Sequence, residues 1–126
     1  MLTYYNAVLI PARSFEHKLF TNVFCCSTKI HGFKDLYHLI NCDTVEHVCV
    51  MINDNYYDVW LDELGKVNHK MPCICLEQYN DVLAGNIVIT KGGDDYEGLT
   101  DEDIIAIQQW VYDARLDLYN RIAPYM

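Results

Sequence analysis

Six carboxylates lie close together near the C-terminal end of the 126-residue chain, with no lysine or arginine among them. They are Asp94, Asp95, Glu97, Asp101, Glu102 and Asp103. Calcium-binding EF-hand loops place acids at alternate positions and close on a glutamate, and this spacing does not match that pattern. Two interpretations remain open. The segment is either a solvated loop that runs into a helix, or a carboxylate patch that imitates nucleic-acid phosphates and binds a basic protein partner.

The cysteines and histidines could in principle bind a metal or act as nucleophiles, but their spacing supports neither well. Structural zinc sites separate paired ligands by about two to four residues, whereas Cys73 and Cys75 are separated by one. In a strand these two thiols would share a face, as would His47 and Cys49. No P-loop or nucleophile elbow is present. We therefore expect free thiols, no metal and no other cofactor, and binding is favoured over catalysis.

Aromatic residues form a third group, with ten tyrosines, four phenylalanines and two tryptophans. Neighbouring residues on a strand face opposite ways, so the pairs Tyr4-Tyr5 and Tyr56-Tyr57 each direct one ring outward unless a partner covers it. Exposed tyrosine and tryptophan rings are typical anchors for protein partners and stacking platforms for bases. The commonest explanation is an oligomer interface, so we expect self-association.

The composition indicates one acidic domain over residues 1–126, because 52% apolar residues in a chain of this length suffice for one core. No stretch approaches the roughly 18 to 20 apolar residues of a membrane span, and no signal peptide is recognisable, so a cytoplasmic protein is expected. The net charge is −9; residues 1–40 hold four basic and two acidic residues, and the remainder holds five and sixteen. This balance opposes binding to nucleic-acid phosphates or anionic membranes.

Hydrophobic patterns in the middle of the chain predict antiparallel strands. Thr44–Ile52 is followed by Asn53-Asp54-Asn55, which favours a tight hairpin, and Tyr56–Asp62 alternates on its return. A turn with Gly65 in the left-handed conformation is expected next. The other predicted strands are Leu2–Ala12, a short run at Lys66-Val67, Cys73–Glu77 and Asn86–Lys91. Strands this closely spaced favour antiparallel neighbours.

Two helices are predicted to pack on this sheet. Residues 32–40 have apolar residues at helical spacing. Thr100 can cap a helix over Asp101–Ile122, whose apolar residues recur every three or four positions. Arg13–Phe20 is interpreted as a short helix, followed by an extended piece at Val23–Ser27. The predicted fold class is α+β, an antiparallel four- to five-stranded meander sheet packed by a short helix and a long C-terminal helix.

Five segments between about residues 36 and 107 carry a family resemblance. They are Leu39-Ile40-Asn41-Cys42-Asp43, Tyr56-Tyr57-Asp58-Val59-Trp60, Asp62-Glu63-Leu64-Gly65-Lys66, Val82-Leu83-Ala84-Gly85-Asn86-Ile87-Val88-Ile89 and Gly98-Leu99-Thr100-Asp101-Glu102-Asp103-Ile104. In this order they resemble a small domain of unknown function that is frequent in bacteriophages, prophages and plasmids, especially of gut Firmicutes. The resemblance implies a mobile-element accessory protein in a bacterial cytoplasm. Small phage proteins of this kind often counter host immunity.

This context leads to two hypotheses, and we take the first as the leading prediction because of the basic start of the chain and its many tyrosines. In the first, an oligomer sequesters a nucleotide-derived immune signal by stacking its base and meeting its phosphates. The candidate residues are the aromatic Tyr4, Tyr5, Tyr56 and Trp60 and the basic Arg13, Lys18 and Lys34. In the second, the acidic segment blocks a basic host protein that binds nucleic acid, such as a CRISPR effector. An enzyme that degrades the signal would need a general base such as His31, His38 or His47 in a pocket.

Overall fold

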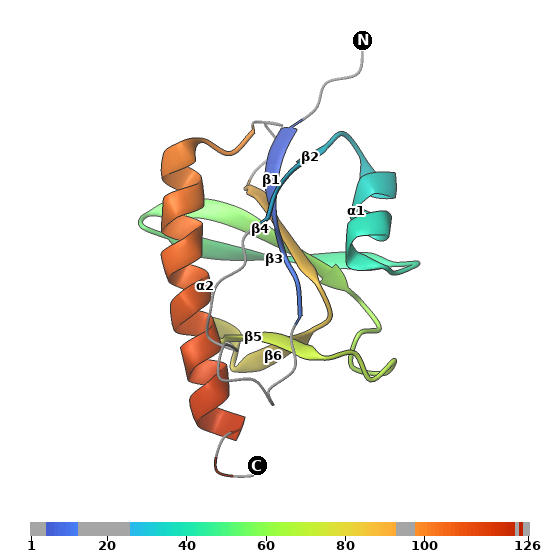
Figure 1. Ribbon diagram of the computed structural model, residues 1–126, viewed down its shortest axis with the longest axis vertical. Coiled ribbons are helices and arrows are strands. Elements are labelled where there is room, and N and C mark those ends of the chain that lie inside the picture. Colours follow the sequence, from blue (N-terminus) through green and yellow to red (C-terminus); the bar gives the residue numbers. More distant parts are fainter. Residues whose placement is uncertain (1–4, 13–25, 93–97, 123, 125–126) are drawn as a thin grey trace.

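The computed structural model describes residues 5–12, 26–92, 98–122 and 124, which form two antiparallel sheets and two α-helices (Figure 1). In chain order the elements are β1 (Tyr5–Ile10), β2 (Cys26–Ile30), α1 (Phe33–Ile40), β3 (Val45–Ile52), β4 (Asn55–Asp62), β5 (Pro72–Leu76), the short 3-10 helix η1 (Glu77–Tyr79), β6 (Asp81–Ala84), β7 (Ile87–Lys91) and α2 (Asp101–Ile122). The α+β class, the antiparallel sheet and both packing helices are confirmed. The helix predicted at Arg13–Phe20 lies outside the described residues.

The larger sheet has five strands in the order β2-β1-β7-β4-β3. β3 and β4 form the predicted hairpin, in which Asn53 and Asp54 have positive φ angles of 49° and 67°, as a two-residue type I′ turn requires. β7 lies between β1 and β4, so the strand order does not follow the chain as a simple meander would. β5 and β6 leave this sheet and pair with each other. The four consecutive residues Cys73 to Leu76 of β5 are all buried. Because neighbouring side chains on a strand point to opposite faces, both faces of β5 are covered.

Alternating side chains of the larger sheet build a core on each of its faces. On one face, Val59 packs in a cluster with Ile107 of α2. On the other, Val88 packs with Leu36 and Ile40 of α1. The two helices therefore lie on opposite sides of the sheet, with the long α2 running across one of them (Figure 1). This arrangement leaves the outer face of α2 toward solvent.

Two predictions for the connection between β4 and β5 are wrong. Lys66 and Val67 lie in a turn rather than a strand, and Val67 is 71% exposed. Among the described glycines, Gly85 has a positive φ of 88°, whereas Gly65 does not. Gly65 is needed for a different reason: a Cβ atom there would lie 2.6 Å from the carbonyl oxygen of Ala84. The close approach of two backbones excludes a side chain at this position.

Replacing Gly65 with alanine should lower the free energy of unfolding by about 1 to 3 kcal/mol, because the new methyl group overlaps the β6 backbone and forces it to move. Urea unfolding followed by circular dichroism measures the change. Gly32→Ala is the matched control, since nothing lies within 4 Å of the point that its new Cβ atom would occupy; its effect should stay below about 1 kcal/mol. Equal stability of the Gly65→Ala variant and the wild type would contradict the close approach.

Candidate functional site

The start of α2 is fixed by a reciprocal pair of hydrogen bonds. The amide of Thr100 donates to Oδ2 of Asp103 over 2.8 Å, and the amide of Asp103 donates to Oγ1 of Thr100 over 3.2 Å. This is a capping box, which satisfies amide groups that the first helical turn leaves free. The predicted cap at Thr100 and the predicted helix Asp101–Ile122 are both confirmed.

Asp103 points inward and joins α2 to the large sheet. Its side chain is buried, receives a 2.6 Å hydrogen bond from the hydroxyl of Tyr57 and lies 2.8 Å from Nζ of Lys91. Burial alone would raise the pKa of Asp103, but the hydrogen bonds from Lys91, Thr100 and Tyr57 outweigh it and lower the pKa to about 2. Asp103 therefore stabilises the packing of α2 on the large sheet and does not belong to an exposed acidic patch.

The pKa of Asp103 makes the stability depend on pH in acid. The pKa is about 2 in the folded protein against an ordinary 3.8, so the carboxylate stabilises the fold above about pH 5 and this contribution is lost as the pH falls toward 2. The shift corresponds to about 2 kcal/mol. Urea unfolding at pH 7 and pH 3 should show about half of this loss, and the change should be much smaller in Asp103→Asn. The exposed neighbour offers the control: Asp101→Asn should keep the wild-type pH dependence.

The other predicted acids are placed only in part. Asp101 and Glu102 are exposed in the first turn of α2, where carboxylates also interact favourably with the helix dipole. Asp94, Asp95 and Glu97 lie outside the described residues.

A groove of about 460 Å³ follows α2 on the side that faces β5 and η1. Three carboxylates line it, from Glu77, Asp113 and Asp117, and the last two are one helical turn apart. Trp110 adds a large, half-buried ring to the same groove. These acids were not among the residues predicted from the sequence, although their spacing of four residues in an expected helix was available as a signal.

The environment of a neighbouring thiol reflects the same charges. Burial raises the pKa of Cys75; Arg121 opposes the shift, and Asp117, Glu77 and Asp81 add to it.

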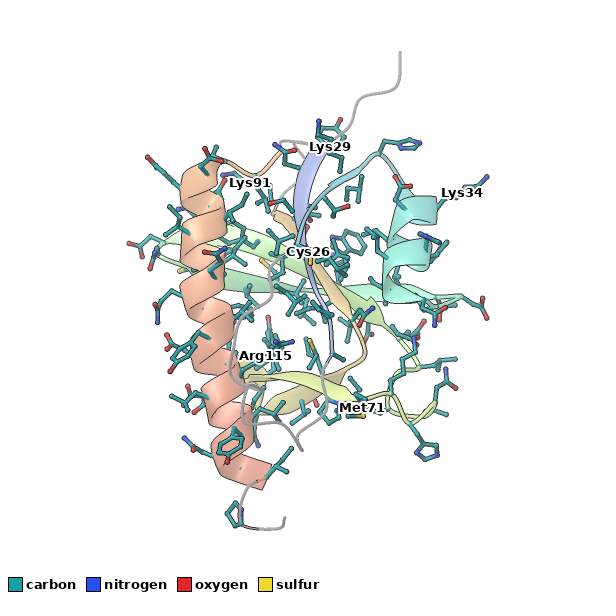
Figure 2. All side chains as sticks on the ribbon, in the orientation of Figure 1. Cys26, Lys29, Lys34, Met71, Lys91 and Arg115 are labelled. Atoms are coloured by element: carbon teal, nitrogen blue, oxygen red, sulfur yellow. The ribbon has the colours of Figure 1, made fainter. Side chains whose placement is uncertain are left out.

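α2 contains five Asp or Glu residues and two Arg residues. Arg115 is fully buried and points from α2 into the protein (Figure 2), whereas Arg121 donates to Oδ1 of Asn80 over 3.2 Å. The solvent side of α2 is therefore predominantly acidic.

The residues predicted to bind a nucleotide do not gather in one described pocket. Tyr5 and Trp60 both pack, half-buried, against the core beneath α1. The indole of Trp60 donates to Oγ1 of Thr90 over 2.9 Å. Tyr56 is 59% exposed on the β3–β4 hairpin, and Lys34 projects outward from α1 (Figure 2). Tyr4, Arg13 and Lys18 lie outside the described residues.

A second, more open hollow of about 640 Å³ lies beside α1 and includes Lys34. Tyr37 and His38 line it, and so do the acids Asp43 and Asp62. Two of its lining residues are joined by Lys70: its Nζ lies 2.7 Å from buried Asp62 and donates to the carbonyl of Asn41, the C-cap of α1, over 2.6 Å. Such a cation stabilises the negative end of a helix.

The thiol in this hollow is poorly suited to nucleophilic attack. Burial raises the pKa of Cys42, and the nearby charge of Asp62 adds to the shift, so the unreactive protonated form dominates at neutral pH. The five cysteines in the described part of the chain are all free thiols.

The histidines considered as general bases are distributed over the fold. His31 lies 3.0 Å from Asp35, His38 lines the hollow beside α1, and the ring of His47 lies 4.6 Å from that of Trp60. Within residues 5–12, 26–92, 98–122 and 124, no three His, Cys, Asp or Glu side chains are arranged to hold a metal ion.

Comparison with known proteins identifies a family. A family model described as a domain of unknown function (DUF3846) matches residues 19–112. No curated protein and no solved structure matches the chain. The match covers the elements from β2 to β7 and the first half of α2, but not β1, and Asp113 and Asp117 lie just after its end. Neither described helix is long and apolar enough to cross a membrane.

Proposed function

The chain belongs to the DUF3846 family, whose description states no activity, and we propose from its own surface that it is a binding protein whose acidic α2 face holds a basic protein partner. The observation that carries this proposal is the groove along α2, which is lined by Glu77, Asp113 and Asp117 together with a half-buried Trp110. Asp101 and Glu102 continue the negative charge to the start of the helix.

The physical basis is complementarity of charge around an aromatic anchor. Several carboxylates on one surface raise the rate of encounter with a basic surface and fix its orientation. A tryptophan in a groove can supply the contact area that converts encounter into affinity. A partner that normally binds nucleic acid fits this surface, because it presents lysines and arginines arranged for phosphates.

The resemblance to proteins of bacteriophages, prophages and plasmids gives this proposal its biological setting. We place the protein in the bacterial cytoplasm as a counter-defence factor, with a nucleic-acid-binding defence protein of the host as its partner. The carboxylates would then occupy the site that the partner uses for phosphates.

Affinity capture from bacterial lysate tests this proposal with two baits that differ only in the groove. The wild type should retain a basic protein at about 0.1 M salt and release it at about 0.5 M, since screening weakens exposed charges. The double variant Asp113→Lys/Asp117→Lys should not retain it. Asp54→Lys is the control, because Asp54 is exposed in the β3–β4 turn and is not among the residues that line the groove. Retention of the same protein by all three baits would contradict the proposal.

The hollow beside α1 supports sequestration of a nucleotide-derived signal as a second candidate function. Lys34 could meet a phosphate there and Tyr37 could stack a base, while an oligomer would supply the remaining contacts. Asp43 and Asp62 line the same hollow and repel phosphate, which places this candidate second.

Native mass spectrometry of protein purified from bacteria with active nucleotide signalling tests sequestration directly. A bound ligand would appear as a mass difference between native and denatured protein, and Lys34→Glu should abolish it. Protein without such a ligand in every oligomeric state would contradict sequestration of the signals present in those cells.

A further inference from the structure

The outer face of α2 carries an apolar stripe next to the acidic groove. Ile105, Tyr112 and Leu116 are large side chains that remain 67%, 42% and 38% exposed. They are separate from the buried face of the helix, which includes Ile107 and Val111. Leu116 also lines the groove, so the stripe and the acids form one continuous surface.

The spacing of the stripe is that of a helix-packing seam. Ile105, Gln109, Tyr112, Leu116 and Tyr119 follow one another at steps of four, three, four and three residues. This alternation is the repeat by which one helix packs along another, with a single polar residue, Gln109, at one of its positions. Tyr119 packs partly buried against Cys75 and Leu118, so the exposed part of the seam runs from Ile105 to Leu116 and is about 17 Å long, enough to contact about three turns of a partner helix.

The charges beside the seam determine which kind of helix can pack on it. Asp101 and Glu102 lie at its N-terminal end, and Asp113 lies next to its centre. The basic residues of α2 do not balance them, because Arg115 is buried and Arg121 lies at the far end beside Asn80. Two copies packed through this seam would bring carboxylates together, and like charges in contact are destabilising. A helix with lysines or arginines beside its apolar face would find opposite charges instead.

We propose that this seam docks a basic amphipathic helix of the protein partner, with the partner's apolar residues against Ile105, Tyr112 and Leu116 and its cations against Asp113 and Asp117. The inference rests on the proposed function and names the element of the partner that is recognised. Recognition then follows the helix-in-groove mode, in which apolar anchors supply affinity and flanking charges supply orientation.

A synthetic peptide tests this docking mode without knowledge of the natural partner. The probe is a helix of about 21 residues with leucine at its seam positions and lysine at its flanks. A peptide of the same composition with a scrambled order retains the charge but lacks the apolar face. Binding is measured by fluorescence anisotropy against the intact chain and two pairs of variants. One pair changes the stripe (Ile105→Ser, Tyr112→Ser) and the other changes the charges (Asp113→Lys, Asp117→Lys).

The wild type should bind the amphipathic probe at least about tenfold more tightly than the scrambled peptide. Each stripe variant should weaken binding by about tenfold, as loss of an apolar anchor does. The thermal unfolding of Ile105→Ser should change little, because that side chain is 67% exposed. The charge variants should weaken binding and reduce its dependence on salt.

Different negative results distinguish the helix-docking mode from the proposed binding of a basic partner. If the scrambled peptide binds equally well, or the stripe variants bind like the wild type, the docking mode is overturned and an acidic surface alone remains. If the charge variants bind like the wild type, the proposed function itself is contradicted. Sedimentation equilibrium completes the test: a dimer of the wild type that Ile105→Ser dissociates would show that a second copy covers the seam, and would overturn the inference.

Discussion

Arg115→Met should lower the free energy of unfolding by about 3 kcal/mol or more. The guanidinium is fully buried; its Nε donates to the carbonyl of Cys73 over 3.3 Å, and one Nη donates to the carbonyl of Pro11. Arg115 thus joins α2 to β5 and to the chain that leaves β1. Methionine retains most of the apolar packing but no donor, and each carbonyl left without a partner in the interior costs roughly 1 to 3 kcal/mol.

The same substitution elsewhere on α2 supplies the control for this prediction. Arg121→Met removes an exposed arginine whose one described hydrogen bond is to Asn80, and surface changes of this kind usually have little effect on stability. Chemical unfolding of both variants distinguishes a specific clamp from a general requirement for positive charge on the helix. Equal stability of the two variants would refute the role of Arg115 as a clamp.

Asp103→Ala is expected to destabilise the protein by about 3 kcal/mol. It removes the helix cap, worth about 1 kcal/mol, and leaves the buried hydroxyl of Tyr57 without its acceptor, which costs roughly 1 to 3 kcal/mol. Lys91 also loses the carboxylate that lies 2.8 Å from its Nζ. Asp101→Ala changes an exposed acid in the same turn and should leave the unfolding midpoint close to that of the wild type.

A double-mutant cycle identifies the contact responsible. Tyr57→Phe alone should destabilise, but in the Asp103→Ala background it should have little further effect, because the hydroxyl has already lost its acceptor. Coupled neighbours typically give interaction energies of about 0.5 to 3 kcal/mol. Strictly additive effects of the two substitutions would show that the hydrogen bond contributes nothing.

Local sequence signals were sufficient for most of the secondary structure. Thr100 followed by three acids and a three-and-four apolar pattern defined α2, and the Asn53-Asp54 pair defined the hairpin. β6 was missed because it has only four residues, of which two are buried. The position of β7 between β1 and β4 could not be inferred, since it depends on long-range pairing rather than on local pattern.

The site was harder to predict than the fold because exposure depends on tertiary packing. Asp103 looked like one of six equivalent acids, yet its contacts with Tyr57 and Lys91 bury it. Trp60 was expected to stack a base, but its side chain is half-buried against the core beneath α1. Asp113 and Asp117 form a groove only with Glu77, which comes from a distant part of the chain.

The most direct test of the account is the dissociation constant between the purified chain and the basic protein it retains, measured as a function of salt. For the wild type, affinity should fall steeply between about 0.05 and 0.5 M salt. For Asp113→Lys/Asp117→Lys, affinity should be lost at every salt concentration, while Asp54→Lys should match the wild type. Binding that is insensitive to salt and equal in all three proteins would contradict the central claim that the acidic face of α2 is the functional surface.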